Sequence, residues 1–283
     1  MKANQANPDI LKWLNECLAR GHSPESLRET AVGAGWHPSV VDEALAEAKG
    51  EELVANRPVI LGPNDHIIPG PDLAQSPNFV QLSDRKVEIH TVVHHPRVVV
   101  FGNVLSHQEC DELIALAQPR LSRSLTVDNQ TGGEQTHAAR TSDGMFFKRA
   151  EFPLIDRIER RLAELVRWPV QNGEGLQVLR YRAGAQYVPH YDYFDPAQPG
   201  TAKILERGGQ RVGTIVMYLR APERGGATTF PDIGLEVAPV KGSAVFFSYD
   251  EPTPESKTLH GGAPATLGEK YVATKWMREW EFI

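Results

Sequence analysis

The chain has 283 residues, of which 41% are hydrophobic and 23% are charged, and its formal net charge is −6. A chain of this length can bury a core without disulfides or a structural metal. The two cysteines are too few for a disulfide scaffold or a four-cysteine zinc site. The acidic balance argues against nucleic acid as a partner, since binding it requires a basic face. No apolar signal segment and no apolar run of about 18 residues occurs, so we expect a cytoplasmic protein with no membrane partner.

Residues 1–50 have the pattern of a small all-α bundle of three short helices. The first helix is predicted from about Asp9 to Ala19. The second begins with Pro24 after the cap residue Ser23, and Pro38 opens the third. The segment resembles a ubiquitin-associated domain. It is either a structural appendage or a head that binds a protein or nucleic-acid partner, and none of its residues shows which.

Residues 51–80 are predicted to be a proline-rich linker. Proline fixes φ and removes a backbone donor, so neither a helix nor a central strand is expected to persist there. The prolines of this stretch are Pro58, Pro63, Pro69, Pro71 and Pro77. Residues 81–283 then form the large domain.

The large domain is predicted to combine two helices with many short strands. The capping-box residues Ser106 and Glu109 start a helix that runs to about Gln118, and Phe152–Val166 carries one apolar stripe. Strands are expected at 87–93, 98–101, 176–182, 188–193, 211–219, 228–230, 235–237, 244–249 and 271–280. This order favours an α+β fold, a double-stranded β-helix (jelly roll) flanked by helices, in addition to the small N-terminal all-α bundle.

Three residues have the chemistry of a metal centre. His190 and Asp192 are two apart, so on a strand they would point to the same face. His260 is the candidate for a third ligand. Two imidazoles and one carboxylate leave coordination positions open and suit non-haem Fe(II), whereas a structural zinc site would be closed. Taken alone, however, His-x-Asp also fits a hydrogen-bonded surface pair.

Lys270 lies ten residues after His260, near the start of the last long strand. A lysine that points into an apolar barrel is costly unless it meets an anion, which a bound dicarboxylate would supply. The alternative is a lysine at the sheet edge whose ammonium reaches solvent.

With these residues in place, the chain resembles the catalytic domain of the prolyl 4-hydroxylases, in particular the collagen-type branch of these Fe(II)- and 2-oxoglutarate-dependent dioxygenases. The resemblance covers about residues 95–283. It is carried by residues 181–192, 225–231, 241–247 and 259–276, with support from 101–117 and 140–142.

The resemblance implies a role for each matching residue. The iron ligands would be His190, Asp192 and His260, and Lys270 would pair with the distal carboxylate of 2-oxoglutarate. Tyr181 and Thr228 would hydrogen-bond the same carboxylate, and Trp276 would line the pocket near the metal. Tyr271 departs from the tryptophan that many relatives carry there.

The resemblance also implies a reaction: C4 hydroxylation of proline in a peptide or protein, with O2 and 2-oxoglutarate consumed and succinate and CO2 released. L-ascorbate would restore oxidised iron. Two alternatives stay open. One is an oxygenase that acts on another residue or a free small molecule, and the other is a non-catalytic jelly-roll binding module.

Residues 122–147 are predicted to form a substrate lid, because the segment is polar, lacks a period and contains the hinge pair Gly132-Gly133. Its residues Arg140, Thr141 and Ser142 are candidates for contacts with the peptide. The alternative is an ordinary surface loop.

Overall fold

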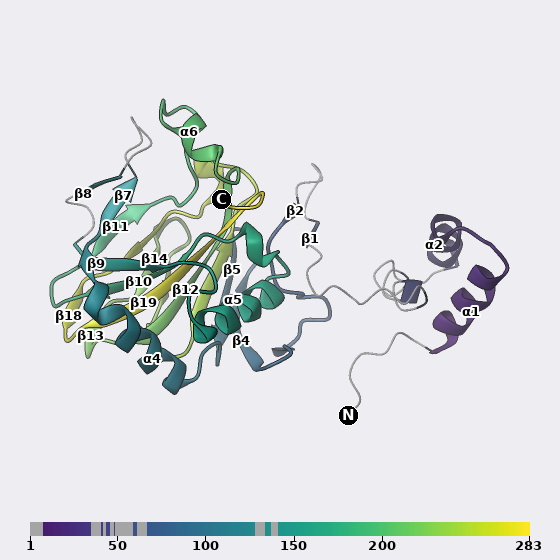
Figure 1. Ribbon diagram of the computed structural model, residues 1–283, viewed down its shortest axis with the longest axis horizontal. Coiled ribbons are helices and arrows are strands. Elements are labelled where there is room, and N and C mark those ends of the chain that lie inside the picture. Colours follow the sequence, from purple (N-terminus) through teal and green to yellow (C-terminus); the bar gives the residue numbers. More distant parts are fainter. Residues whose placement is uncertain are drawn as a thin grey trace. The chain divides into compact units, whose positions relative to one another are not determined.

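The computed structural model describes residues 8–34, 41, 44–45, 48, 59–60, 67–127, 134–136 and 141–283. The chain divides into two compact units, Met1–Ala55 and Asn56–Ile283, and each of them is considered by itself (Figure 1). None of the helices in these described stretches is long and apolar enough to cross a membrane.

The first unit contains the helices α1 (Pro8–Ala19) and α2 (Pro24–Gly33). Ser23 caps α2 by accepting a hydrogen bond from the Ser26 amide at 3.2 Å, as the sequence predicted. Pro38, the predicted start of the third helix, lies outside the described residues. A separate small core is formed by Ile10, Leu14, Leu27, Ala31, Val41, Ala44 and Leu45.

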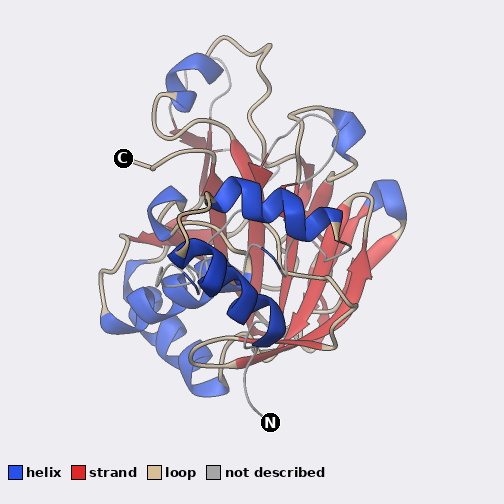
Figure 2. Ribbon diagram, turned by 90° about the vertical axis from the view of Figure 1, so that its right-hand side faces the viewer, coloured by secondary structure: helices blue, strands red, loops and turns tan. Residues whose placement is uncertain are grey.

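The second unit is built from two antiparallel sheets, which confirms the α+β jelly-roll prediction. The large sheet has nine strands, in the spatial order β3 (Phe79–Gln81), β4 (Lys86–Val93), β5 (Arg97–Gly102), β16 (Ala244–Ser248), β12 (Arg211–Arg220), β19 (Lys270–Arg278), β10 (Leu176–Tyr181), β9 (Asp143–Phe147) and β6 (Ser122–Arg123). The small sheet has four, in the order β11 (Tyr187–His190), β17 (His260–Gly262), β14 (Thr228–Phe230) and β15 (Leu235–Val237). Figure 2 shows the long strands side by side in red.

The remaining strands of this unit form short ribbons. Three two-stranded ribbons pair β1 (Val59–Ile60) with β2 (Ile67–Ile68), β7 (Leu125–Val127) with β8 (Glu134–Thr136), and β13 (Arg224–Gly225) with β18 (Ala265–Leu267). A short helix, α6 (Thr201–Leu205), interrupts the connection from β11 to β12.

The later part of the predicted linker belongs to the body of this unit. The Gly70 amide donates to the Val166 carbonyl at 2.8 Å, and Ile68 is buried. β3 ends the segment and pairs with β4 at the edge of the large sheet. A chain rich in proline therefore still lies along the domain, because isolated backbone donors between the prolines find acceptors there.

Two helices, α4 (His107–Ala117) and α5 (Pro153–Leu165), cover the outer face of the large sheet (Figure 1). The capping box of Ser106 and Glu109 is present, as predicted. Apolar side chains of the helices, such as Leu113 on α4 and Leu162 on α5, belong to one core with strand residues. These include Val178, Ile215 and Ala273.

A buried ionic cluster joins the two helices. The Arg161 guanidinium, on α5, donates to both oxygens of Glu109 at 2.7 and 3.0 Å and to the Asp84 carboxylate at 2.6 Å. Burial opposes ionisation of Glu109, but the hydrogen bonds and charge of Arg161 outweigh it and lower the pKa of Glu109 to about 2. The cluster therefore remains ionised at neutral pH.

Arg161→Ala should lower the free energy of unfolding by about 3–5 kcal/mol, because it leaves the Glu109 carboxylate buried without its main partner. Urea denaturation followed by circular dichroism measures this difference. The neighbouring Arg160 is the matched control, since its side chain is 72% exposed, and Arg160→Ala should leave the urea midpoint unchanged. Equal midpoints for the two variants would contradict this account of the cluster.

The central strand β19 is buried on both faces, and its side chains point alternately toward the helices and toward a pocket. Tyr271, Ala273 and Met277 join the core under the helices. The alternate residues Lys270, Val272, Thr274 and Trp276 line a pocket on the opposite face, between the two sheets.

Candidate metal centre

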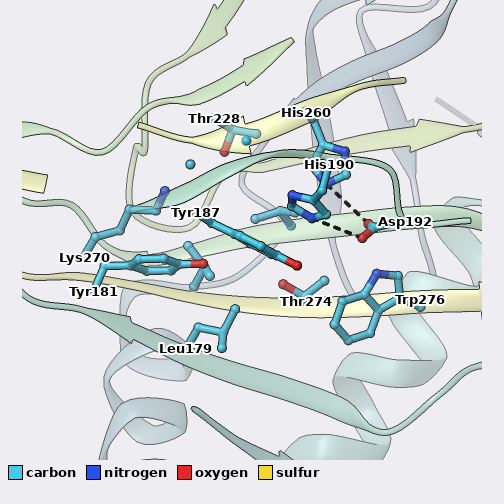
Figure 3. Close-up of a pocket in the computed structure, with 14 residues that line it drawn as sticks. Leu179, Tyr181, Tyr187, His190, Asp192, Thr228, His260, Lys270, Thr274 and Trp276 are labelled. Atoms are coloured by element: carbon cyan, nitrogen blue, oxygen red, sulfur yellow. Dashed lines mark ion pairs between the residues drawn. The ribbon is translucent and has the colours of Figure 1, made fainter. Parts of the chain in front are cut away.

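His190, Asp192 and His260 come together in the pocket between the sheets (Figure 3). Their ligand atoms all lie within 4.8 Å of one another. The Asp192 carboxylate stands between the imidazoles, with Oδ1 3.5 Å from His190 Nε2 and Oδ2 3.4 Å from His260 Nε2. The three residues selected from the sequence thus form one cluster.

The sheet positions the two imidazoles directly opposite each other. His190 ends β11 and is paired in register with His260, the first residue of β17. Each imidazole donates from Nδ1 to the carbonyl two residues earlier, at 3.0 Å: His190 to Val188 and His260 to Thr258. These bonds fix the tautomer in which Nε2 carries a lone pair toward Asp192.

The route by which Asp192 reaches the cluster differs from the prediction. A strand from Val188 to Tyr193 was expected to hold His190 and Asp192 on one face, but β11 ends at His190. Asp192 lies in the bend that follows. Pro189 donates no backbone hydrogen bond and sits in an edge strand, where such a residue is tolerated. His190 and Asp192 do reach the same site, as predicted, but the reason given for this was wrong, because the two residues do not share a strand.

The electrostatics of the cluster suit a metal ligand set. Burial lowers the pKa of His260 to about 4, and the Asp192 charge only partly opposes this shift. Burial also opposes ionisation of Asp192, but the adjacent imidazoles and the Arg211 guanidinium outweigh it and hold its pKa below the usual range. At neutral pH the cluster therefore offers a neutral His260 and an ionised carboxylate.

The other end of the pocket carries a buried cation. Lys270 is 3% exposed, and its Nζ donates to the Gly226 carbonyl at 2.7 Å. No ion pair within the described part of the chain includes Lys270, and burial lowers its pKa to about 8. Tyr181 is its register partner on β10, with the Lys270 Nζ 5.2 Å from the ring centroid. An anion would relieve this burial.

Thr228 lies at the same end of the pocket, and its hydroxyl already has one partner. The Tyr218 hydroxyl donates to Thr228 Oγ1 at 2.7 Å, so the Thr228 proton is directed elsewhere. Figure 3 shows Tyr181, Thr228 and Lys270 around one end of the pocket and the metal cluster at the other. The two ends belong to a single pocket with an empty volume of about 450 Å³, part of it open to solvent.

Trp276 lines the pocket beside the cluster of His190, Asp192 and His260, as predicted. Its indole Nε1 is buried and finds no hydrogen-bond partner among the described residues. The Arg211 guanidinium stacks 4.2 Å from the Trp276 ring and is held by a bidentate pair with Glu174. Tyr187 stacks on the His190 imidazole with 3.7 Å between ring centroids. Aromatic groups therefore shield the cluster on two sides.

The predicted lid residues have different outcomes. Arg140 lies outside the described residues. The Thr141 hydroxyl both donates to and accepts from the Gln186 backbone. Ser142 is fully buried and bonds Ser124 at 2.9 Å, so its hydroxyl lies inside the fold, and its contact with the peptide stays a prediction. The lid range 122–147 is also too wide, because β9 pairs with β10 inside the large sheet.

Several residues of the site escaped the sequence argument. Tyr218 and Arg211 look like ordinary strand residues in the sequence, and so do Thr214 and Tyr249, which lie behind Asp192. Their alternation with apolar neighbours is the signal that places Thr214 and Tyr218 on one face of β12 together with the pocket residue Val216.

The residues present fit iron and 2-oxoglutarate. Two imidazoles and one carboxylate are the donor set of non-haem Fe(II) centres with open positions. The buried Lys270 lacks an anionic partner among the residues described, and a dicarboxylate bound at the metal would supply one. The fold and the site together define an Fe(II)- and 2-oxoglutarate-dependent oxygenase domain.

Comparison with known proteins agrees with this class. Residues 176–278 match the 2OG-Fe(II) oxygenase superfamily. Prolyl 4-hydroxylase 5 of Arabidopsis thaliana is 38% identical over 221 residues, which cover 70% of this chain and 73% of that protein. For prolyl 4-hydroxylase 1 of the same plant the identity is 40% over 219 residues, covering 71% and 75%. A crystal structure of the viral collagen prolyl hydroxylase from Paramecium Bursaria Chlorella virus-1, a 2OG complex, is 31% identical and covers 64% of this chain and 95% of that one, with a TM-score of 0.49.

The chain therefore belongs to the prolyl 4-hydroxylase family. It is a dioxygenase whose cofactor is Fe(II) and whose co-substrates are 2-oxoglutarate and O2.

The affinity for 2-oxoglutarate should fall as the pH rises above about 8, the pKa of Lys270. The dicarboxylate binds the protonated lysine, so above this pH binding must take up a proton, and affinity should drop by up to about tenfold per pH unit. Isothermal titration calorimetry between pH 7 and 9.5 measures the profile. Lys270→Arg keeps its charge throughout this range, so its profile should be flat. A flat profile for the wild type would contradict the assignment.

Proposed function

We propose that the protein hydroxylates proline at C4 in a peptide or protein substrate. The observation that carries the proposal is a single pocket with the His190, Asp192 and His260 cluster at one end and the buried Lys270 at the other. The names of the Arabidopsis relatives support proline as the target. In the balanced reaction, one atom of O2 enters the proline C–H bond. The other enters succinate, which forms from 2-oxoglutarate with release of CO2.

The chain supplies placement and charge. Iron bound at the cluster would supply the oxidising chemistry. Lys270 and the nearby hydroxyl groups bind the distal carboxylate of 2-oxoglutarate, which directs the keto-acid end toward the metal ligands. Trp276 and Tyr187 restrict water beside the cluster, and the indole Nε1 offers a free donor to an incoming group.

The proposal is tested with proline-rich peptides, Fe(II), 2-oxoglutarate and ascorbate. We expect succinate release to rise when peptide is added, and mass spectrometry should find one added oxygen on proline. A matched peptide with alanine in place of proline is the control. Stimulation by both peptides, or oxygen on another residue, would favour an oxygenase of different specificity. If no iron-dependent turnover of 2-oxoglutarate occurred at all, the chain would be a binding module and the proposal would fail.

A further inference from the structure

A short chain of buried hydroxyl groups lies behind the metal cluster. Thr214, on β12, donates from Oγ1 to Asp192 Oδ2 at 2.8 Å. The Tyr249 hydroxyl lies 3.3 Å from the same Thr214 oxygen. Thr214 has no exposed surface, and Tyr249 is 3% exposed. These groups are therefore shielded from water.

The hydrogen bonds in this chain have one direction. An ionised carboxylate accepts but does not donate, and a threonine hydroxyl has a single proton. Because that proton goes to Asp192, the Tyr249 hydroxyl must donate to Thr214. The order of donation is Tyr249 to Thr214 to Asp192 Oδ2, and each hydroxyl donates to one acceptor.

We infer that Thr214 is a positioning residue for Asp192, that Tyr249 supports it, and that together they set the orientation of the metal-binding carboxylate. The inference rests on the proposed function, which takes Asp192 as an iron ligand. Backbone carbonyls fix both imidazoles through Nδ1. Asp192 lies beyond the end of β11, so sheet pairing does not hold its carboxylate. The hydroxyl chain gives the third ligand the outer hydrogen bond that the imidazoles already have.

Thr214→Val keeps the branched shape of the side chain and removes its proton. It should weaken metal binding by about 10- to 100-fold, the usual effect of removing an outer hydrogen bond to a ligand. Thr214→Ser keeps the hydroxyl and should retain binding. Tyr249→Phe should have a smaller effect, because it acts only through Thr214. The double variant Thr214→Val, Tyr249→Phe should bind no more weakly than Thr214→Val alone.

The test is calorimetric titration of the full-length, metal-free protein with Mn(II), without 2-oxoglutarate, so that no turnover is involved. Thr201→Val is the matched control, since it removes a buried threonine hydrogen bond, to the Asp195 carbonyl, outside the metal cluster. Thermal unfolding of each metal-free variant reports its folding separately. The inference predicts the full loss of affinity for Thr214→Val and for the double variant, a smaller loss for Tyr249→Phe, and affinities like the wild type for Thr214→Ser and Thr201→Val.

Two results would overturn the inference. One is Mn(II) affinity of Thr214→Val within about twofold of the wild type, well below the expected 10-fold loss. The other is an equal loss in Thr201→Val, which would indicate general destabilisation. If the wild type itself bound neither Mn(II) nor Fe(II), the metal centre and the proposed function would fail instead.

Discussion

Lys270→Met should weaken 2-oxoglutarate binding by at least about 30-fold, because removing one partner of a buried, hydrogen-bonded charge pair costs about 2 kcal/mol or more. The same change should raise the melting temperature of the protein without co-substrate. There, Lys270 is a buried charge that donates to the Gly226 carbonyl and has no anionic partner among the described residues, and methionine fills similar space without that desolvation cost. The two effects have opposite signs because the lysine is held ready for an anion.

Calorimetric titration with 2-oxoglutarate and thermal unfolding of the unliganded protein measure these two effects. Lys241→Met is the matched control, since Lys241 is a surface lysine paired with Asp111. It should change neither quantity appreciably. Tight 2-oxoglutarate binding by Lys270→Met, or a lowered melting temperature without ligand, would show that Lys270 has a structural role.

His260→Ala should abolish peptide-dependent succinate release and weaken metal binding by more than about 100-fold, which exceeds the range typical of residues that only support a ligand. The variant removes one of the three metal-binding side chains, so only His190 and Asp192 remain. Mn(II) titration and succinate assays measure the two losses. His90→Ala is the control, because His90 is half exposed and lies outside the cluster. Unchanged turnover in His260→Ala would refute the assignment of the cluster.

The sequence was most informative where local signals and tertiary packing agree. The capping box of Ser106 and Glu109 fixed the start of α4, and the apolar stripe of α5 placed that helix within one residue at each end. His260 and Lys270 could be selected because residues 259–276 resemble the family, and because a lysine that points into an apolar barrel is costly without an anion.

Other features depend on contacts between distant segments. β9 escaped prediction because its Gly144 and the polar segment before it hide the alternation, although pairing with β10 makes it a strand. Ser142 is polar in the sequence, but Ser124 meets it inside the fold. Thr214 and Tyr249 resemble core residues until the bend after β11 brings Asp192 against them. Sequence spacing alone could not predict the β9–β10 pairing, the Ser124–Ser142 bond or the contact of Thr214 with Asp192.

The register pair of His190 and His260 has a consequence for the unfolded chain. The two residues are neighbours across β11 and β17 but about 70 residues apart in sequence, so a metal ion bound to both closes a loop of that length. In the chain-entropy description of cross-links, a loop of this size corresponds to about 4 kcal/mol. The ion would thus act as a reversible cross-link between the edge strand β11 and its neighbour β17. Chelation should free that strand before the large sheet opens, as hydrogen exchange of the β11 amides would show.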